Sequence, residues 1–257
     1  MSARVALTRP VSAAIAHCEL THVDRTPIDL LRARDEHAAY ERALERHGYV
    51  VRRLPLDDTL PDAVFIEDTA IVLDEVAVIT HPGAESRRAE TVAVREALAG
   101  IRPIVEVTEP GTIDGGDVLR LGRTLYVGVG ARSNEAGMAQ LREALAPHGY
   151  AVRGVTFEGA LHLKTAATAV REDTVLVNPA WVDATQFDGA WRIEIDPSEP
   201  FAGNALLLHD GSVIHADAFP RTRERLTLAG IRVTSVPAGE LAKAEGGVTC
   251  CSLLLER

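Results

Sequence analysis

The sequence predicts an α/β protein made of about five copies of one unit: two strands, a helix and a third strand. Five times a short polar or small-residue turn leads directly into an apolar run: E-D-T-A-I-V-L, G-G-D-V-L-R-L, H-L-K-T-A-A-T-A-V, G-N-A-L-L-L and T-C-C-S-L-L-L. These openings recur at intervals of roughly 40 to 50 residues, which is within the range of structural repeats. Hairpin signals and second strands follow most of them, for example L-G-R-T-L-Y-V-G and H-D-G-S-V-I-H-A. Because such units bury their sheets only by stacking, we expect a ring whose opening turns meet at one end.

Helix signals follow several of these hairpins. Thr26, with Pro27 after it, is the expected N-cap of the first helix, and Ser86 and Ser133 are the expected N-caps of the next two. Gly48 ends the first of them. The predicted helices cover residues 26–48, 86–100, 133–149, 221–230 and 239–245.

Charge and composition exclude several classes of function. The formal net charge is -10 and the pI is near 5.4, which argues against DNA, RNA or an anionic membrane as the main partner. A small cationic ligand suits such a protein better. The sequence contains no signal peptide pattern and no run of 18 apolar residues, so we expect a cytoplasmic protein. Its three cysteines are then thiols.

Two acidic pairs interrupt apolar sequence where the first two repeats open. Glu67 and Asp68 are neighbours in P-D-A-V-F-I-E-D-T-A-I-V, and Asp114 and Asp117 flank two glycines in T-I-D-G-G-D-V-L. Carboxylates are almost always exposed unless they are paired, so solvated turns are one interpretation. The other is a functional site, in which the glycines allow close backbone approach and fix the direction of the carboxylates.

Two arginines fall at predicted helix N-termini. Arg87 follows Ser86 and Arg132 precedes Ser133, so the helix macrodipole disfavours both charges. A bound anion would reverse that effect, because helix N–H groups and a guanidinium together make a good carboxylate site. Two arginines that fold back into solvent are the alternative interpretation.

Cys250 and His162 both lie in the opening turn of a repeat. Convergence of the turns would bring a thiol next to an imidazole, the usual arrangement for an activated nucleophile, although a lone histidine is more often a hydrogen-bonded core residue. If residues 251–255 form a strand, Cys250 and Cys251 point to opposite faces and have different roles. No C-x-x-C, H-E-x-x-H, G-x-G-x-x-G or P-loop pattern supports zinc or a nucleotide cofactor.

Five motifs in one order carry a resemblance to a known family: L-P-D-A-V-F-I-E-D-T-A-I-V, P-G-A-E-S-R-R-A-E-T, G-T-I-D-G-G-D-V-L, L-H-L-K-T and G-G-V-T-C-C-S-L-L-L. With these, the chain resembles dimethylarginine dimethylaminohydrolase essentially from end to end. The resemblance implies the pentein fold, a five-bladed α/β propeller of ββαβ units with pseudo-fivefold symmetry, as one catalytic domain over residues 1–257. It also implies hydrolysis of Nω-methylated L-arginine (asymmetric dimethylarginine or monomethylarginine) to L-citrulline and dimethylamine or methylamine through a covalent cysteine thiouronium intermediate.

The resemblance assigns the catalytic roles residue by residue. Cys250 corresponds to the nucleophile, His162 to the general acid and base, and Asp114 to the triad carboxylate, where other members have a longer Glu. The implied substrate contacts are Leu20, Asp62, Glu67, Asp68, Arg87, Arg132 and Ala244. Residues 11–25 align poorly and would belong to a mobile lid. No metal or cofactor is implied, the partner is a small-molecule substrate, and a homodimer is considered.

Physical chemistry supports such a site. A planar guanidinium matches carboxylates, so Asp68 and Asp114 are expected to hold that end of the substrate while the two arginines hold its α-carboxylate. The bound cation would favour the thiolate of Cys250.

Three other activities remain open. An arginine deiminase-like hydrolase would use similar residues on another guanidino substrate, although such enzymes carry an inserted helical bundle that this repeat pattern lacks. An amidinotransferase would need a site that excludes water. A non-catalytic binder of arginine analogues would need the carboxylates and arginines but no thiol.

Overall fold

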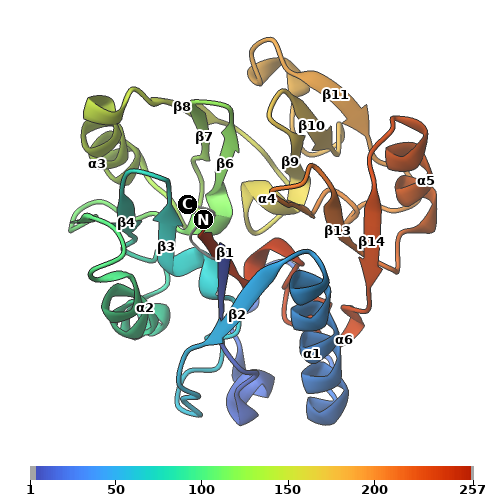
Figure 1. Cartoon of the computed structure of the whole chain (residues 1–257), viewed down its shortest axis with the longest axis horizontal. Coiled ribbons are helices and arrows are strands. Elements are labelled where there is room, and N and C mark those ends of the chain that lie inside the picture. Colours follow the sequence, from blue (N-terminus) through green and yellow to red (C-terminus); the bar gives the residue numbers. More distant parts are fainter. Residues whose placement is uncertain (1–3, 256–257) are drawn as a thin grey trace.

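The computed structural model describes residues 4–255, whose strands form five three-stranded sheets around a common centre (Figure 1). In every sheet the middle strand pairs antiparallel with the first strand of the repeat and parallel with the last. The longer helices lie on the outside of the ring in Figure 1. The predicted five-bladed α/β architecture is therefore confirmed.

The blades follow one another in chain order. Their strands are β3 (Ala70–Val72), β4 (Ala77–Ile79) and β5 (Ile104–Glu106); β6 (Val118–Leu121), β7 (Thr124–Gly128) and β8 (Ala151–Val155); β9 (Ala167–Arg171), β10 (Thr174–Val177) and β11 (Trp191–Glu194); β12 (Ala205–Leu207), β13 (Val213–Ala216) and β14 (Val233–Val236); and β15 (Leu253–Leu255), β1 (Arg4–Thr8) and β2 (Tyr49–Arg53). The α-helices are α1 (Leu30–Arg46), α2 (Thr91–Leu98), α3 (Glu135–Leu145), α4 (Leu163–Ala166), α5 (Pro220–Leu228) and α6 (Gly239–Ala242). The 3-10 helices are η1 (Ala13–His17), η2 (Ile66–Thr69), η3 (Glu85–Glu90), η4 (Gly115–Asp117), η5 (Ala146–His148), η6 (Ala184–Gln186) and η7 (Thr249–Cys251).

The two ends of the chain share the last blade. Strand β1 pairs antiparallel with β15, so that Val5 lies opposite Leu255 and Leu7 opposite Leu253. The parallel neighbour of β1 is β2. This pairing closes the ring and fixes the position of η7, which directly precedes β15.

One blade departs from the predicted unit. Between β10 and β11, the described chain has only the 3-10 turn η6 in place of an α-helix. The five helix ranges predicted from the sequence assigned none to this stretch, although the predicted unit contains one.

The predicted N-caps are wrong for three helices. Asp29 caps α1, because its carboxylate accepts from the N–H groups of Leu31 and Arg32, and Asn134 caps α3. Ser133 is not available as a cap, since its hydroxyl accepts from the Asp114 N–H and donates to Asp117. Ser86 lies inside η3, so the helix predicted from residue 86 is a 3-10 helix followed by α2.

Apolar side chains pack between neighbouring blades. One buried cluster joins Leu119 and Leu121 of β6 to Val175 and Val177 of β10. Each fully buried aliphatic side chain contributes roughly 1.5–3 kcal/mol, so such clusters hold the blades in a fixed arrangement. None of the helices within residues 4–255 combines the length and apolar character that a membrane span requires.

Candidate active site

The opening turns of the blades meet at one end of the ring, as the repeat predicted. The Gly116 N–H of η4 donates to Asp68 Oδ1 of η2 at 2.8 Å. The Leu163 N–H of α4 donates to Asp117 Oδ1 at 3.0 Å, and Thr249 Oγ1 of η7 donates to Glu67 Oε2 at 2.7 Å. Residues far apart in the sequence are thereby fixed in one polar cluster.

Gly115 and Gly116 allow this close approach. A Cβ at Gly115 would lie 2.0 Å from the Glu67 carbonyl oxygen, and one at Gly116 would lie 2.7 Å from both Asp68 Oδ1 and His162 Nδ1. Any side chain there would push the first two turns apart or displace the histidine. This explains the paired glycines of the second motif.

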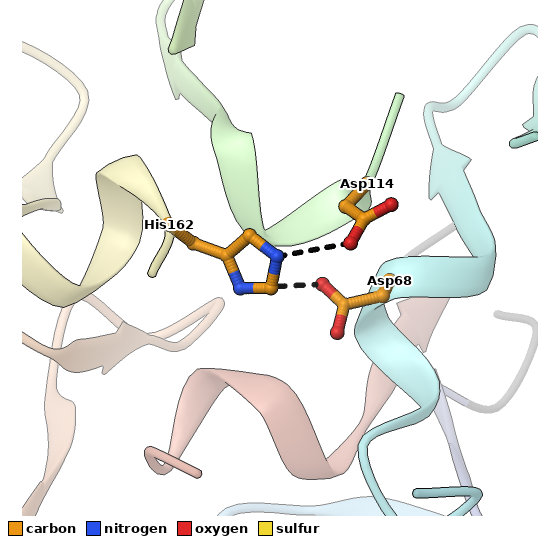
Figure 2. A group of neighbouring side chains, drawn as sticks. All are labelled: Asp68, Asp114 and His162. Atoms are coloured by element: carbon orange, nitrogen blue, oxygen red, sulfur yellow. Dashed lines mark hydrogen bonds and ion pairs between the residues drawn. The ribbon is translucent and has the colours of Figure 1, made fainter. Parts of the chain in front are cut away.

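His162 lies between two carboxylates (Figure 2). Its Nε2 is 3.0 Å from Asp114 Oδ2, and its Nδ1 is 3.9 Å from Asp68 Oδ1. Burial alone would lower the His162 pKa, but the charge of Asp68 and the hydrogen bond to Asp114 raise it to about 9. The imidazole is therefore protonated at neutral pH.

The Asp117 carboxylate, held by two hydrogen bonds, fixes the backbone next to His162. Besides binding the Leu163 N–H next to His162, its carboxylate accepts a hydrogen bond from Ser133 Oγ at 2.6 Å. Burial raises the Asp117 pKa to about 6 against the opposing charge of His162.

Cys250 is half-buried on η7, and the two adjacent cysteines have different surroundings. The strand-based reason for this is wrong, because β15 begins only at Leu253. On a 3-10 helix successive side chains are rotated by roughly 120°. Cys250 thus lines the pocket described below, whereas Cys251 packs in the apolar core.

The Cys250 thiol is difficult to ionise. Burial, followed by the charges of Glu67 and Asp68, raises its pKa to about 12. The Gly247 N–H, 3.3 Å from Sγ, acts in the opposite direction. Without a ligand the sulfur is therefore a neutral thiol.

Glu67 belongs to a buried polar group beneath the thiol. Its Oε1 pairs with Lys164 Nζ at 2.5 Å, and its Oε2 accepts from Thr249. Asn204 in the fourth opening turn binds the Thr249 hydroxyl and the Lys164 carbonyl. The two carboxylates of the first motif therefore have different partners: Glu67 pairs with Lys164, and Asp68 faces His162.

The two predicted arginines differ in their surroundings. Arg87 is saturated, with ion pairs to Asp68 at 2.5 Å and Glu90 at 2.7 Å and hydrogen bonds to two carbonyl groups. Arg132 is only 8% exposed, and its Nη1 has no hydrogen-bond partner. The charge of Arg87 is therefore stabilised by carboxylates and needs no bound anion, contrary to the prediction from the macrodipole, whereas Arg132 Nη1, 4.0 Å from Asp114 Oδ2, keeps a buried donor for an anion.

One small cavity brings most of the predicted residues together. It is lined by seven of them: Asp62, Asp68, Arg87, Arg132, His162, Ala244 and Cys250. Asp114, which is fully buried, does not line this cavity, and Glu67 lines a separate cavity of about 530 Å³; Leu20 packs on the apolar cluster that contains Ala244. The small cavity has a volume of about 20 Å³, room for about one water molecule, so an arginine-sized ligand enters only after local opening.

Further lining residues were not predicted from the sequence: Glu19, Phe65, Leu161, Glu245 and Gly246. Glu19 lies in the segment expected to form a lid (residues 11–25), and Glu245 lies in the turn after α6. Their positions depend on irregular loops, for which the sequence carries no periodic signal.

Asp68, Asp114 and His162 also offer three potential metal ligands within 4.8 Å of one another. A metal needs a neutral imidazole, whereas this one is held protonated, and Asp68 is already paired with Arg87. These three side chains therefore fit a protonated histidine paired with two carboxylates better than they fit a metal site.

Comparisons with known proteins agree with this arrangement. The arginine deiminase family model matches residues 56–199. The chain is 41% identical to N(G),N(G)-dimethylarginine dimethylaminohydrolase of Streptomyces coelicolor over 99% of this chain and 98% of that protein, and 36% identical to the Pseudomonas aeruginosa enzyme of the same name over 88% and 89%.

Solved structures give the same result. A cysteine-to-serine mutant of the Pseudomonas aeruginosa enzyme, complexed with citrulline, matches with a TM-score of 0.93 at 33% identity, over 99% of this chain and 100% of the other. The N-terminal domain of the cyanobacterial arginine dihydrolase ArgZ, at 20% identity and a TM-score of 0.88, shares the fold. The chain is a pentein-fold hydrolase and belongs to the dimethylarginine dimethylaminohydrolase family.

Proposed function

We propose that this protein hydrolyses Nω-methylated L-arginine to L-citrulline and methylamine or dimethylamine. The observation that carries the proposal is one pocket that holds a thiol, a protonated histidine and buried carboxylates, together with Arg132, whose Nη1 has no hydrogen-bond partner and lies 4.0 Å from Asp114 Oδ2. Its support from relatives is the enzyme name shared by two proteins at 41% and 36% identity.

The substrate is held at both ends. Asp68 and Asp62 present carboxylates for the guanidinium and ammonium groups, and Arg132 offers its donor to the α-carboxylate. Arg87 can assist only by giving up part of its pairing with Asp68. Asp114, which is fully buried behind His162, serves to orient the imidazole rather than to contact the guanidinium.

The first chemical step follows from the charges. A cationic guanidinium next to Cys250 offsets the carboxylates that raise the thiol pKa, so the proton leaves to solvent as the substrate binds. The thiolate then attacks the guanidinium carbon. Protonated His162 donates its proton to the methylated nitrogen as the C–N bond breaks, and a neutral amine departs.

The second step regenerates the protein. His162, now neutral, removes a proton from water, and the resulting hydroxide adds to the thiouronium carbon. As the C–S bond breaks, the added hydroxyl passes its proton to the departing sulfur, the carbonyl of citrulline forms, and Cys250 returns as the neutral thiol. Electrons and atoms balance without a cofactor.

Citrulline release from asymmetric dimethylarginine, monomethylarginine and arginine, measured in parallel, tests this proposal. We expect turnover of the methylated substrates and complete loss in Cys250→Ser, while Cys251→Ser, the matched control, stays active. Turnover of arginine alone would identify a deiminase, and binding without turnover would identify a ligand-binding protein.

Two finer expectations belong to this proposal. Homodimer formation is tested by light scattering of the purified protein, and a cytoplasmic location by fractionation of cells that express it.

A further inference from the structure

The Glu245 carboxylate attaches the lid segment, residues 11–25, beside the pocket. Glu245 accepts hydrogen bonds from three consecutive backbone N–H groups: Thr21 at 3.0 Å, Val23 at 2.8 Å, and His22 between them. Glu245 also lines the pocket; in the sequence it follows Ala244 and precedes Cys250 by five residues. One side chain therefore joins the lid to the segment that carries the thiol.

A second observation indicates that this side chain has a specific role. Glu245 has φ of 58°, the left-handed region, which glycine adopts far more easily. It is the one residue other than glycine in this region among residues 4–255. The position follows α6, where chain reversal favours glycine, and two glycines come next. A glutamate at this position costs backbone strain that a glycine would avoid, but it supplies the carboxylate that binds the lid.

The far side of the lid is held separately. The Asp62 carboxylate accepts the Glu19 N–H at 3.1 Å, and Ser86 Oγ donates to Glu19 Oε1 at 2.6 Å. Asp62 belongs to the proposed substrate contacts, so an incoming ligand competes for this attachment. Once a ligand occupies Asp62, the Glu245 attachment is still available to hold the closed lid in place.

We propose that Glu245 is the latch of the lid, a positioning residue that controls access to Cys250. In the latched state the cavity holds about one water molecule, so the three hydrogen bonds to Glu245 must break or shift before a ligand of arginine size enters. Afterwards they re-form over the bound ligand and exclude solvent.

Two variants of Glu245 distinguish a role in holding the lid closed from a general contribution to the stability of the fold. Glu245→Gln keeps the side-chain length but places an amide among three donors, and Glu245→Gly removes the side chain while relieving the backbone strain. Glu224→Gln, an exposed carboxylate on α5, is the control.

Hydrogen exchange at residues 21–23 and iodoacetamide labelling of Cys250, assigned by fragmentation mass spectrometry, measure opening without substrate. We expect both rates to rise about tenfold in both variants, while the melting temperature of Glu245→Gly does not fall below that of Glu245→Gln. If either rate in both variants stays within about twofold of the control, the latch is refuted.

The effect of the latch on turnover rests on the proposed function, whereas exchange and labelling do not. A protein that releases no citrulline but still shows faster opening in the variants would refute the proposed function and leave the latch intact.

Discussion

Replacing Asp68 with asparagine is expected to make Cys250 react faster with iodoacetamide, although the protein turns over methylated arginine more slowly. The direction follows from the site, where burial and the charges of Glu67 and Asp68 raise the Cys250 pKa to about 12. Removing the Asp68 charge lowers that pKa, while Arg87 keeps its ion pair with Glu90. Turnover falls because the substrate cation loses a carboxylate partner.

The size of the effect can be worked out from the ordinary thiol pKa of 9.0. A rise to about 12 corresponds to about 4 kcal/mol of additional cost for ionising Cys250. At pH 8 the thiolate fraction is then about 10³-fold smaller than for an ordinary cysteine, and labelling slows accordingly. A neighbouring charge shifts a pKa by about one unit or more, so Asp68→Asn should label at least about tenfold faster.

Labelling of Cys250 is followed by mass spectrometry from pH 7 to pH 10, with Asp35→Asn on the exposed face of α1 as the control. The wild-type rate should rise about tenfold per pH unit without a plateau. The proposed lid would slow access equally at every pH, so the test compares the slope of rate against pH and the ratio of rates between the variants. Equal or slower labelling in Asp68→Asn than in the control would refute this electrostatic explanation.

Three further predictions concern His162 and Arg132. Asp114→Asn removes a hydrogen bond that raises the His162 pKa, so the alkaline limb of the kcat profile should move to lower pH; an unmoved limb in steady-state assays would contradict the role of Asp114. Because the His162 pKa rises from 6.5 to about 9 on folding, its contribution to stability is full below pH 6.5 and is lost as the pH rises through 9. Urea unfolding at pH 6 and pH 9.5 should show a decrease about 3 kcal/mol larger in wild type than in His162→Asn, and equal decreases would exclude the shift. Arg132→Lys should raise KM for methylated arginines about tenfold with less change in kcat, because a lysine cannot reproduce the guanidinium geometry; unchanged KM would place the α-carboxylate elsewhere.

The fold was predictable because its signal is repeated. Five polar turns before apolar strands, with hairpins after them, specify the blades without any single strand being decisive. Helix starts were less predictable. Thr26 and Asp29 are both good N-caps in isolation, and the choice of Asp29 depends on its setting, since its own N–H is held by Glu240 from α6.

The composition of the site was predictable, but the state of its side chains was not. Arg87 and Arg132 look alike in the sequence, whereas in the structure Arg87 is saturated and Arg132 Nη1 has no hydrogen-bond partner, with only a 4.0 Å ion pair to Asp114. The difference depends on Glu90, which reaches Arg87 from the next turn of the chain. Glu245 gave no sequence signal, because neither its left-handed backbone nor its lid contacts follow from composition or periodicity.

Mass spectrometry of Cys250 during turnover tests the central claim most directly. Protein quenched with acid during reaction with asymmetric dimethylarginine, and separately with monomethylarginine, should carry an adduct on the peptide that contains Cys250. The adducts should have the same mass, because each substrate loses its methylated amine when the thiouronium forms. Citrulline formation without any adduct, or an adduct that retains the methyl groups, would contradict nucleophilic attack by Cys250 with departure of the amine.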